Sequence, residues 1–152
     1  MLTVITGYGP RVGSSHIMRQ AKVRGLDIKG TKYLHGTMPV EGNPGGYYDL
    51  TDKEVLQLHS GVGKVWPRQM RLLRTIPDKM VVLERKNTDV WLESIDRQMV
   101  REGMTQFTAD DILAITIPLM ARCLEDFPGE IMKVATEDLD NQIKDILTFI
   151  GD

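Results

Sequence analysis

Apolar residues along the chain fall into short unbroken runs that alternate with segments of helical periodicity. Unbroken runs of this kind are typical of buried strands, and they cover residues 2–6, 64–66, 79–84 and 130–134, with 26–28 as a shorter candidate. Apolar spacing of three and four residues predicts helices over 14–24, 68–74, 88–102 and 136–150, and others beginning near 51 and 108. The alternation favours one α/β domain over 1–152, a three-layer αβα sandwich with a central parallel sheet.

Polar residues mark the boundaries of these elements. The stretch 30–46 is rich in glycine, proline and threonine, and long loops of this kind are usually functional. We therefore interpret 30–60 as a variable segment that covers a site or selects an acceptor. Pro118 is expected to kink its helix. Hydroxyl side chains are expected to cap the helices at Ser14 or Ser15, Thr51, Thr88 and Thr136.

Composition narrows the class of protein. The 152 residues are 41% hydrophobic and 26% charged, which is the balance of a globular domain. The net charge of −2 argues against broad nucleic-acid binding, because such binding normally needs a basic surface. We expect no membrane span, since no apolar run approaches the roughly 20 residues needed. We also expect no secretory signal, since the N-terminus lacks a basic region followed by an apolar stretch. Cys123 is the only cysteine, so we expect a cytoplasmic protein without an internal disulfide or a metal site.

The segment from Gly7 to Ser15 joins the first predicted strand to the first predicted helix. Its glycines allow positive φ and a close approach of the backbone to a ligand. Successive N–H groups and a helix N-terminus then attract an anion, which predicts a phosphate cradle. An ordinary turn with a serine cap is the alternative. The residues expected to bind phosphate are Gly9, Pro10, Arg11, Gly13, Ser14 and Ser15.

A second basic station is predicted where the strand 79–84 leads into the next helix. Arg85 and Lys86 follow the carboxyl end of that strand, which shares one rim with the ends of the other parallel strands. Ser94 lies about two turns into the helix. One of these basic residues and the Ser94 hydroxyl would together hold a second phosphate. Solvated charges and a packed serine are the alternative.

In order and spacing, these stations resemble the sulfotransferase family that uses 3′-phosphoadenosine 5′-phosphosulfate. Pro-Arg-Val-Gly-Ser-Ser at 10–15 resembles the family's loop for the 5′-phosphosulfate, Pro-Lys/Arg-Ser-Gly-Thr-Thr/Ser. The segment 85–94 resembles its 3′-phosphate site, where an arginine precedes a serine by eight residues; that position is Lys86 here, beside Arg85. Three further parts of the chain resemble the family. Residues 43–48 resemble a stretch of its short microbial and viral members, and residues 64–67 resemble its Lys-Thr-His segment. Residues 135–139 and 147–151 resemble the C-terminal part of the family.

The resemblance implies a P-loop-type fold and transfer of a sulfuryl group to an unknown hydroxyl or amine acceptor, without a metal. By this resemblance Arg11 and Lys64 stabilise charge on the leaving group, backbone amides from 13–15 hold the 5′-phosphate, and Lys86 or Arg85 with Ser94 holds the 3′-phosphate. A general base is still needed. The candidates in the variable segment are His35, His59, Glu41 and Asp49, of which we favour Asp49 and His59.

The sequence leaves two roles open for each of three aromatic or imidazole side chains. Tyr8 and Trp66 would stack on an adenine or an acceptor ring, or pack in the core, and His16 would contact ligand or pack against the sheet. Trp91 lies on an apolar helix face and is expected in the core.

Two other functions remain as alternatives. The first is a small nucleotide or metabolite kinase of the same P-loop class. The lysine of the Gly-Lys-Ser/Thr motif is replaced by Ser14, and the strand 79–84 ends in Glu84 rather than a magnesium-binding aspartate, which counts against it. The second is a protein that binds a nucleotide or a partner without catalysis. Trp66 stands where the family has its general-base histidine, which supports this second alternative.

Overall fold

The sheet of the protein contains parallel strands only. The computed structural model describes residues 1–30, 48–104 and 106–151. Within these ranges the sheet has four strands in the order β2-β1-β3-β4, and every neighbouring pair is parallel. The predicted α/β class with a parallel sheet is therefore confirmed. The strands are β1 (Leu2–Gly7), β2 (Gly61–Lys64), β3 (Lys79–Glu84) and β4 (Glu130–Ala135).

The predictions for two strands were wrong in part. We predicted a strand at 64–66, but β2 ends at Lys64, and Trp66 is the residue before the 3-10 helix η1 (Pro67–Leu72). The two glycines of β2 concealed it, because glycine is unfavourable in strands. At Gly63 a Cβ atom would lie 2.8 Å from the Leu58 side chain, so close packing requires glycine there. Of the predicted strand 26–28, only Ile28 forms a bridge to β2.

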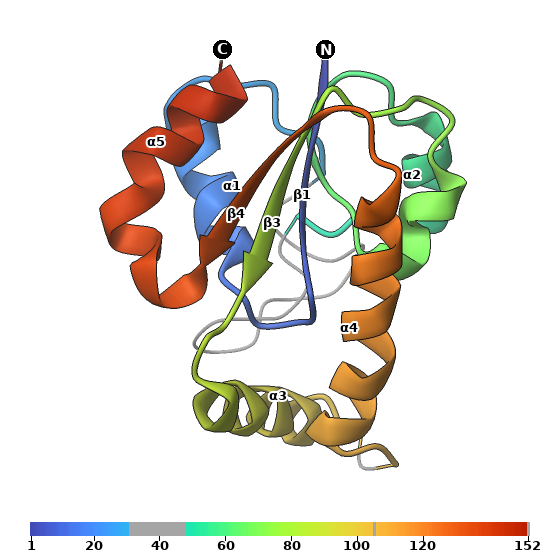
Figure 1. Ribbon diagram of the computed structural model, residues 1–152, viewed down its shortest axis with the longest axis vertical. Helices are drawn as coiled ribbons and strands as arrows, with labels where there is room; N and C mark the ends of the chain where they lie inside the picture. The colour runs from blue at the N-terminus through green and yellow to red at the C-terminus, as the bar shows by residue number, and fades with distance from the viewer. Residues whose placement is uncertain (31–47, 105, 152) are drawn as a thin grey trace.

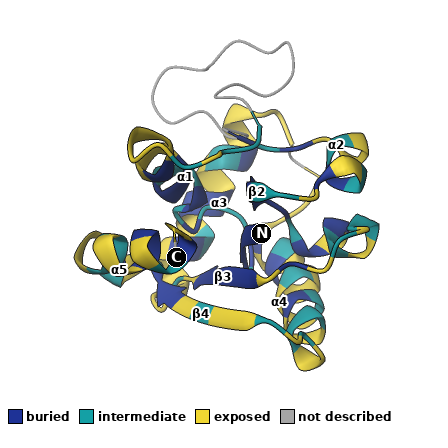
Figure 2. Ribbon diagram, turned by 90° about the horizontal axis from the view of Figure 1, so that it is seen from above, coloured by how far each residue is buried: buried dark blue, intermediate teal, exposed yellow. Residues whose placement is uncertain are grey.

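Helices cover both faces of the sheet, and each face has its own hydrophobic cluster (Figure 1). On one face α1 and α5 pack together, and α3 crosses below the carboxyl ends of the strands. On the other face α2, η1 and α4 contribute to the second cluster. Figure 2 shows that β3 is buried between the layers, whereas β4 is an exposed edge strand. The helices are α1 (Ser14–Val23), α2 (Asp52–Gln57), α3 (Thr88–Arg101), α4 (Ala109–Glu125) and α5 (Leu139–Gly151), with a 3-10 turn η2 (Thr136–Asp138).

One of the predicted caps is confirmed, because Thr51 forms a capping box; Thr108, near which a helix was predicted to begin, forms one as well. The other predicted caps were wrong. Gly13 is the N-cap of α1 and forms no side-chain cap, so neither Ser14 nor Ser15 caps this helix. Asn87 rather than Thr88 caps α3 through its side chain, which accepts a hydrogen bond from the Val90 N–H. The Thr136 hydroxyl instead donates to the carbonyl oxygens of Val12 (2.6 Å) and Glu84 (3.2 Å).

The carboxyl ends of the strands meet at one rim of the sheet. Because the strands are parallel, the loops after Gly7, Lys64 and Glu84 all leave at this rim, as predicted. Both chain termini lie at the opposite end (Figure 1). Among the described residues, no helix combines the length and the apolar character needed to cross a membrane. The glycine loop, Lys64, Arg85 and Lys86 therefore all lie at this rim.

Candidate phosphate-binding site

The loop between β1 and α1 approaches its surroundings so closely that it needs small residues. At Gly9 a Cβ atom would lie 2.6 Å from Leu113 and 2.8 Å from Trp91. Gly13 has φ 94°, and a Cβ atom there would lie 2.8 Å from Leu139. The indole N–H of Trp91, a buried side chain, donates to the Pro10 carbonyl at 2.7 Å. Glycines and this hydrogen bond therefore fix the path of the loop.

The start of α1 adds hydrogen-bond donors to those of the loop. The first N–H groups of any helix have no partner within the helix. Here the helix begins without a side-chain cap, which leaves the hydroxyl groups of Ser14 and Ser15 available for other interactions. The helix dipole places partial positive charge at this terminus. Together these features give the start of α1 the donors and the partial positive charge that an anion would need.

A cavity of about 240 Å³ opens over this loop and contains an excess of positive charge. Among the described residues that line it, four carry basic side chains and one, Asp49, is acidic. The whole chain carries a net charge of −2, so the charge in the cavity is opposite to that of the protein. The basic lining residues are Arg11, Arg19, Lys64 and Arg85.

Lys64 brings a buried ammonium group to the floor of the cavity. Its side chain is only 3% exposed; Nζ lies 2.8 Å from Asp49 Oδ1 and donates to the Ser15 hydroxyl at 3.4 Å. The ammonium also lies 5.2 Å from the centre of the Trp66 ring. Burial lowers the pKa of Lys64, and the carboxylate of Asp49 opposes this shift. The structure thus brings the predicted residues Lys64, Asp49 and Ser15 together.

Arg11 connects the loop with the second station. Its backbone is in the left-handed region, with φ 61°, and its Nε donates to the Ser94 hydroxyl at 3.3 Å. Burial lowers the pKa of Arg11, and the positive charges of Arg101, Arg85 and Arg97 lower it further. Four guanidinium groups from three separate segments therefore repel one another at the rim.

At the second station the structure distinguishes between the two basic candidates. Arg85 lines the cavity, and its Nε is buried without a hydrogen-bond partner in the described part of the chain. Lys86 does not line the cavity: its Nζ lies 3.2 Å from Asp138, and Glu137 accepts its backbone N–H at 2.9 Å. Ser94 is buried, 3% exposed. Of the alternatives that the sequence left open, Arg85 is the residue beside the cavity.

The remaining candidates are distributed as follows. His59 lines a different cavity beside α2, and its Nδ1 lies 3.1 Å from the Gln57 carbonyl oxygen, so the structure does not bring it to the site. His16 and Trp66 line the site cavity, whereas Tyr8 packs against the core. Trp91 is in the core, as predicted. His35, Glu41 and most of the segment 43–48 lie outside the described residues.

Sequence reasoning missed four residues of this region. Arg19 and Gln98 line the cavity, and Arg97 and Arg101 surround Arg11. The α3 residues follow Ser94 at intervals of three, four and seven, which places them on the same helix face as that serine. This spacing is the signal that was available in the sequence.

No protein-family model matches the chain, and a comparison with curated proteins finds no match either.

Proposed function

We propose that the protein is a P-loop-type sulfotransferase-like enzyme that binds 3′-phosphoadenosine 5′-phosphosulfate in this cavity. The observation that carries the proposal is the hydrogen bond between Arg11 and Ser94, residues 83 positions apart. It joins the glycine loop to the second basic station. Arg11 and Arg85 line the cavity, the buried Ser94 hydroxyl is linked to it through Arg11, and together these groups would serve two phosphate groups of one nucleotide. The resemblance of 10–15 and 85–94 to the two phosphate sites of the family supports the same arrangement.

The proposed roles follow from the charges. The loop amides, Ser14 and Ser15 would hold the 5′-phosphate, while Arg85 and Ser94 would hold the 3′-phosphate. Arg11 and Lys64 would stabilise the negative charge that develops on the leaving phosphate oxygen. These interactions favour the transition state most when they are already in place, and the buried position of Lys64 satisfies this condition.

The transfer step would proceed as follows. The acceptor oxygen or nitrogen attacks sulfur, the bond from sulfur to the 5′-phosphate oxygen breaks, and adenosine 3′,5′-bisphosphate leaves with both electrons of that bond. The acceptor proton passes to the Asp49 carboxylate, whose side chain is 24% exposed beside Lys64. Bound phosphosulfate would compete with Asp49 for the Lys64 ammonium. We infer that this competition makes the carboxylate a better base when the co-substrate is present.

A nucleotide-binding protein without catalysis is the second candidate. The observation that favours it is Trp66, whose ring lies against the Lys64 ammonium in the position of the family's histidine. In that case the phosphosulfate would bind and remain intact with every acceptor. A kinase is less favoured, because β3 ends in Glu84 and is followed by Arg85, where magnesium-dependent enzymes of this class place an aspartate.

Calorimetric titration with adenosine 3′,5′-bisphosphate tests the binding step. We expect micromolar binding that does not depend on magnesium. Arg85→Gln and Lys86→Gln form a matched pair, because each removes one positive charge from adjacent positions and only Arg85 lines the cavity. Loss of an ionic hydrogen bond of about 1.5–3 kcal/mol weakens binding by about ten- to hundredfold for Arg85→Gln. Lys86→Gln should change affinity by less than about threefold.

The alternatives predict different outcomes in the same titrations. Binding of ATP only with magnesium would favour the kinase. Equal losses in the two variants would show that the cations act only as general positive charge and would contradict the assigned second station. For catalysis, phosphosulfate consumption is measured with a panel of hydroxyl and amine acceptors. Binding without consumption would favour the non-catalytic protein, and consumption that Asp49→Asn abolishes would support the proposed base.

A further inference from the structure

Helix α4 exposes one long face that carries apolar residues in its middle. Leu113 and Met120 of this helix are buried in the core, whereas Ile115 is 66% exposed and Ile117 is 40% exposed. From residue 112 to 121 the helix has no charged side chain. An exposed helix face normally carries charged or polar residues, so this face is unusual. Its exposed residues are Asp110, Asp111, Ala114, Ile115, Ile117, Pro118, Ala121, Arg122 and Glu125.

One stripe of this face is symmetric in its chemistry. Asp111, Ile115, Pro118 and Arg122 follow one another at intervals of four, three and four residues, so they lie on one side of the helix. Asp111 lies as far before the midpoint of the stripe as Arg122 lies after it, and Ile115 and Pro118 lie on either side of that midpoint. A second copy of the same stripe in the opposite direction therefore matches it at every position.

We propose that α4 is the contact of a two-fold symmetric homodimer in which the two α4 helices pack antiparallel. In this arrangement Asp111 of each copy lies opposite Arg122 of the other, and Ile115 of each copy lies opposite Pro118 of the other. Two-fold contacts use the same patch on both subunits, so a self-complementary patch is what such a contact requires. The small side chains of Ala114 and Ala121 allow the two helices to approach closely.

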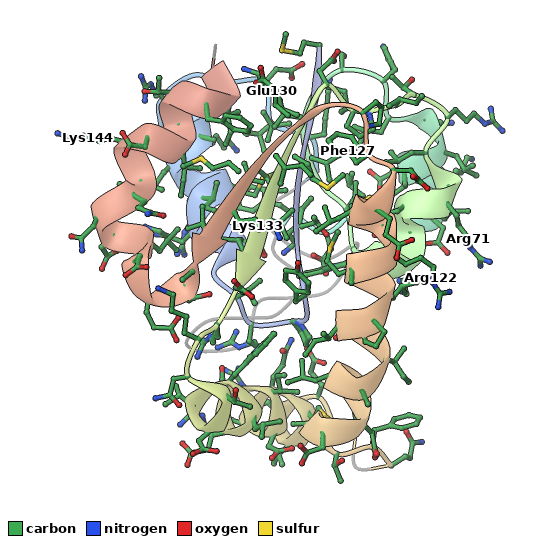
Figure 3. All side chains as sticks on the ribbon, viewed as in Figure 1. Arg71, Arg122, Phe127, Glu130, Lys133 and Lys144 are labelled. Atoms are coloured by element: carbon green, nitrogen blue, oxygen red, sulfur yellow. The ribbon has the colours of Figure 1, made fainter. Side chains whose placement is uncertain are left out.

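The charged ends of the stripe are available for this contact. Among the described residues, no carboxylate forms an ion pair with Arg122, and Figure 3 shows its side chain extending outward from α4, away from the sheet. Asp111 uses one carboxylate oxygen, Oδ2, to accept the Thr108 N–H, which leaves the other oxygen for the partner.

The size of the stripe sets the expected strength. Asp111 and Arg122 are about 16 Å apart along the helix at 1.5 Å per residue. Exposed apolar residues at the junction of α3 and α4 adjoin it, namely Val100, Met104 and Phe107. One helix face with these neighbours is smaller than the roughly 800 Å² per partner of a standard interface, so we expect a reversible dimer with micromolar affinity. No residue of α4 lines the anion cavity, so each site stays open in the dimer.

Sedimentation analysis of the full chain from about 1 to 200 μM tests the proposal. The wild type should show a monomer–dimer equilibrium. Ile115→Glu should weaken dimerisation by about hundredfold, because two-fold symmetry counts the substitution twice. Ile76→Glu is the matched control: Ile76 is also an exposed isoleucine, 69% exposed, but lies outside α4. It should leave the equilibrium unchanged.

The charges give a second, independent test. Arg122→Asp should weaken dimerisation to a similar extent, and the double variant Asp111→Arg with Arg122→Asp should restore it, because the attraction is reversed on both sides. Circular dichroism melting confirms that each variant is folded, since Asp111 also caps α4. A wild type that stays monomeric at 200 μM would overturn the proposal. A dimer that Ile115→Glu leaves intact, or that the charge exchange does not restore, would also overturn it.

Discussion

Replacement of Asp49 by asparagine tests the electrostatic account of the site, because it removes a negative charge while it keeps the shape of the side chain. Asp49 lies 2.8 Å from the ammonium of Lys64, which is only 3% exposed. Removing one partner of a buried ion pair typically costs about 3–5 kcal/mol, because the other charge stays buried. Asp49 itself is 24% exposed, so we expect about 2 kcal/mol. In a domain of this size that lowers the melting temperature by about 4–8 °C.

The pH dependence of this loss has a definite sign. Burial already holds the pKa of Lys64 below its ordinary value, and Asp49→Asn removes a group that opposes this shift. A lysine whose folded-state pKa is lowered destabilises the folded protein at neutral pH, and the penalty disappears as the pH rises towards the ordinary value of about 10.4. As the pH rises, this penalty decreases by more in the variant than in the wild type. The difference between them is therefore largest near pH 7 and narrows towards pH 10.

Thermal melting at several pH values, with and without adenosine 3′,5′-bisphosphate, measures both effects. The ligand should stabilise Asp49→Asn more than the wild type, because its phosphate replaces the missing negative charge beside Lys64. Asp138→Asn is the control, since its ion pair with Lys86 is exposed and contributes little. A variant that melts within about 1 °C of the wild type at pH 7 would refute the argument that burial makes the charge of Lys64 costly.

Three further substitutions test the loop and the arginine cluster. Gly13→Ala should lower stability by about 1–3 kcal/mol, seen in urea titration, because φ is 94° and the new methyl group would lie 2.8 Å from Leu139. Trp91→Phe removes the 2.7 Å hydrogen bond to the Pro10 carbonyl and should cost about 1–3 kcal/mol in the same measurement. Arg97→Gln relieves the repulsion on Arg11, so the melting temperature should stay the same or rise. In calorimetry, the affinity for the bisphosphate should fall and should depend less on salt. A lower melting temperature with unchanged affinity would contradict this.

Much of the fold could be predicted because its signals are local. The unbroken apolar run of β3 and the β-branched run of β1 identify buried parallel strands without any knowledge of the rest of the chain. The prediction failed where packing decided the outcome. β2 contains Gly61 and Gly63, at positions where neighbouring side chains and backbone occupy the space that a Cβ atom would need. No local sequence pattern indicates such a position. The cap at Thr136 failed similarly, since its hydroxyl binds carbonyl groups distant in sequence.

The glycine loop of the site was predicted for the same local reason, but its partners were not. Whether Arg85 or Lys86 faces the cavity depends on the direction in which the chain leaves β3. Glu137, which is distant in sequence, accepts the backbone N–H groups of Lys86 and Asn87 and so helps to fix this direction. His59 was favoured as a base from residue type alone, and residue type does not place a side chain at a site. Asp49, by contrast, reaches the cavity because its backbone forms a bridge to Lys64 at the edge of the sheet.

The arginine cluster supports the proposal that the missed residues belong to the site and not merely to the surface. A folded state that holds the guanidinium groups of Arg11, Arg85, Arg97 and Arg101 near one another is destabilised by their repulsion. Any ligand that binds the folded state and not the unfolded chain stabilises the former. An anion that fits among these groups removes the repulsion as it binds, so the electrostatic energy that lowers the stability of the empty protein raises its affinity for a ligand with more than one phosphate group.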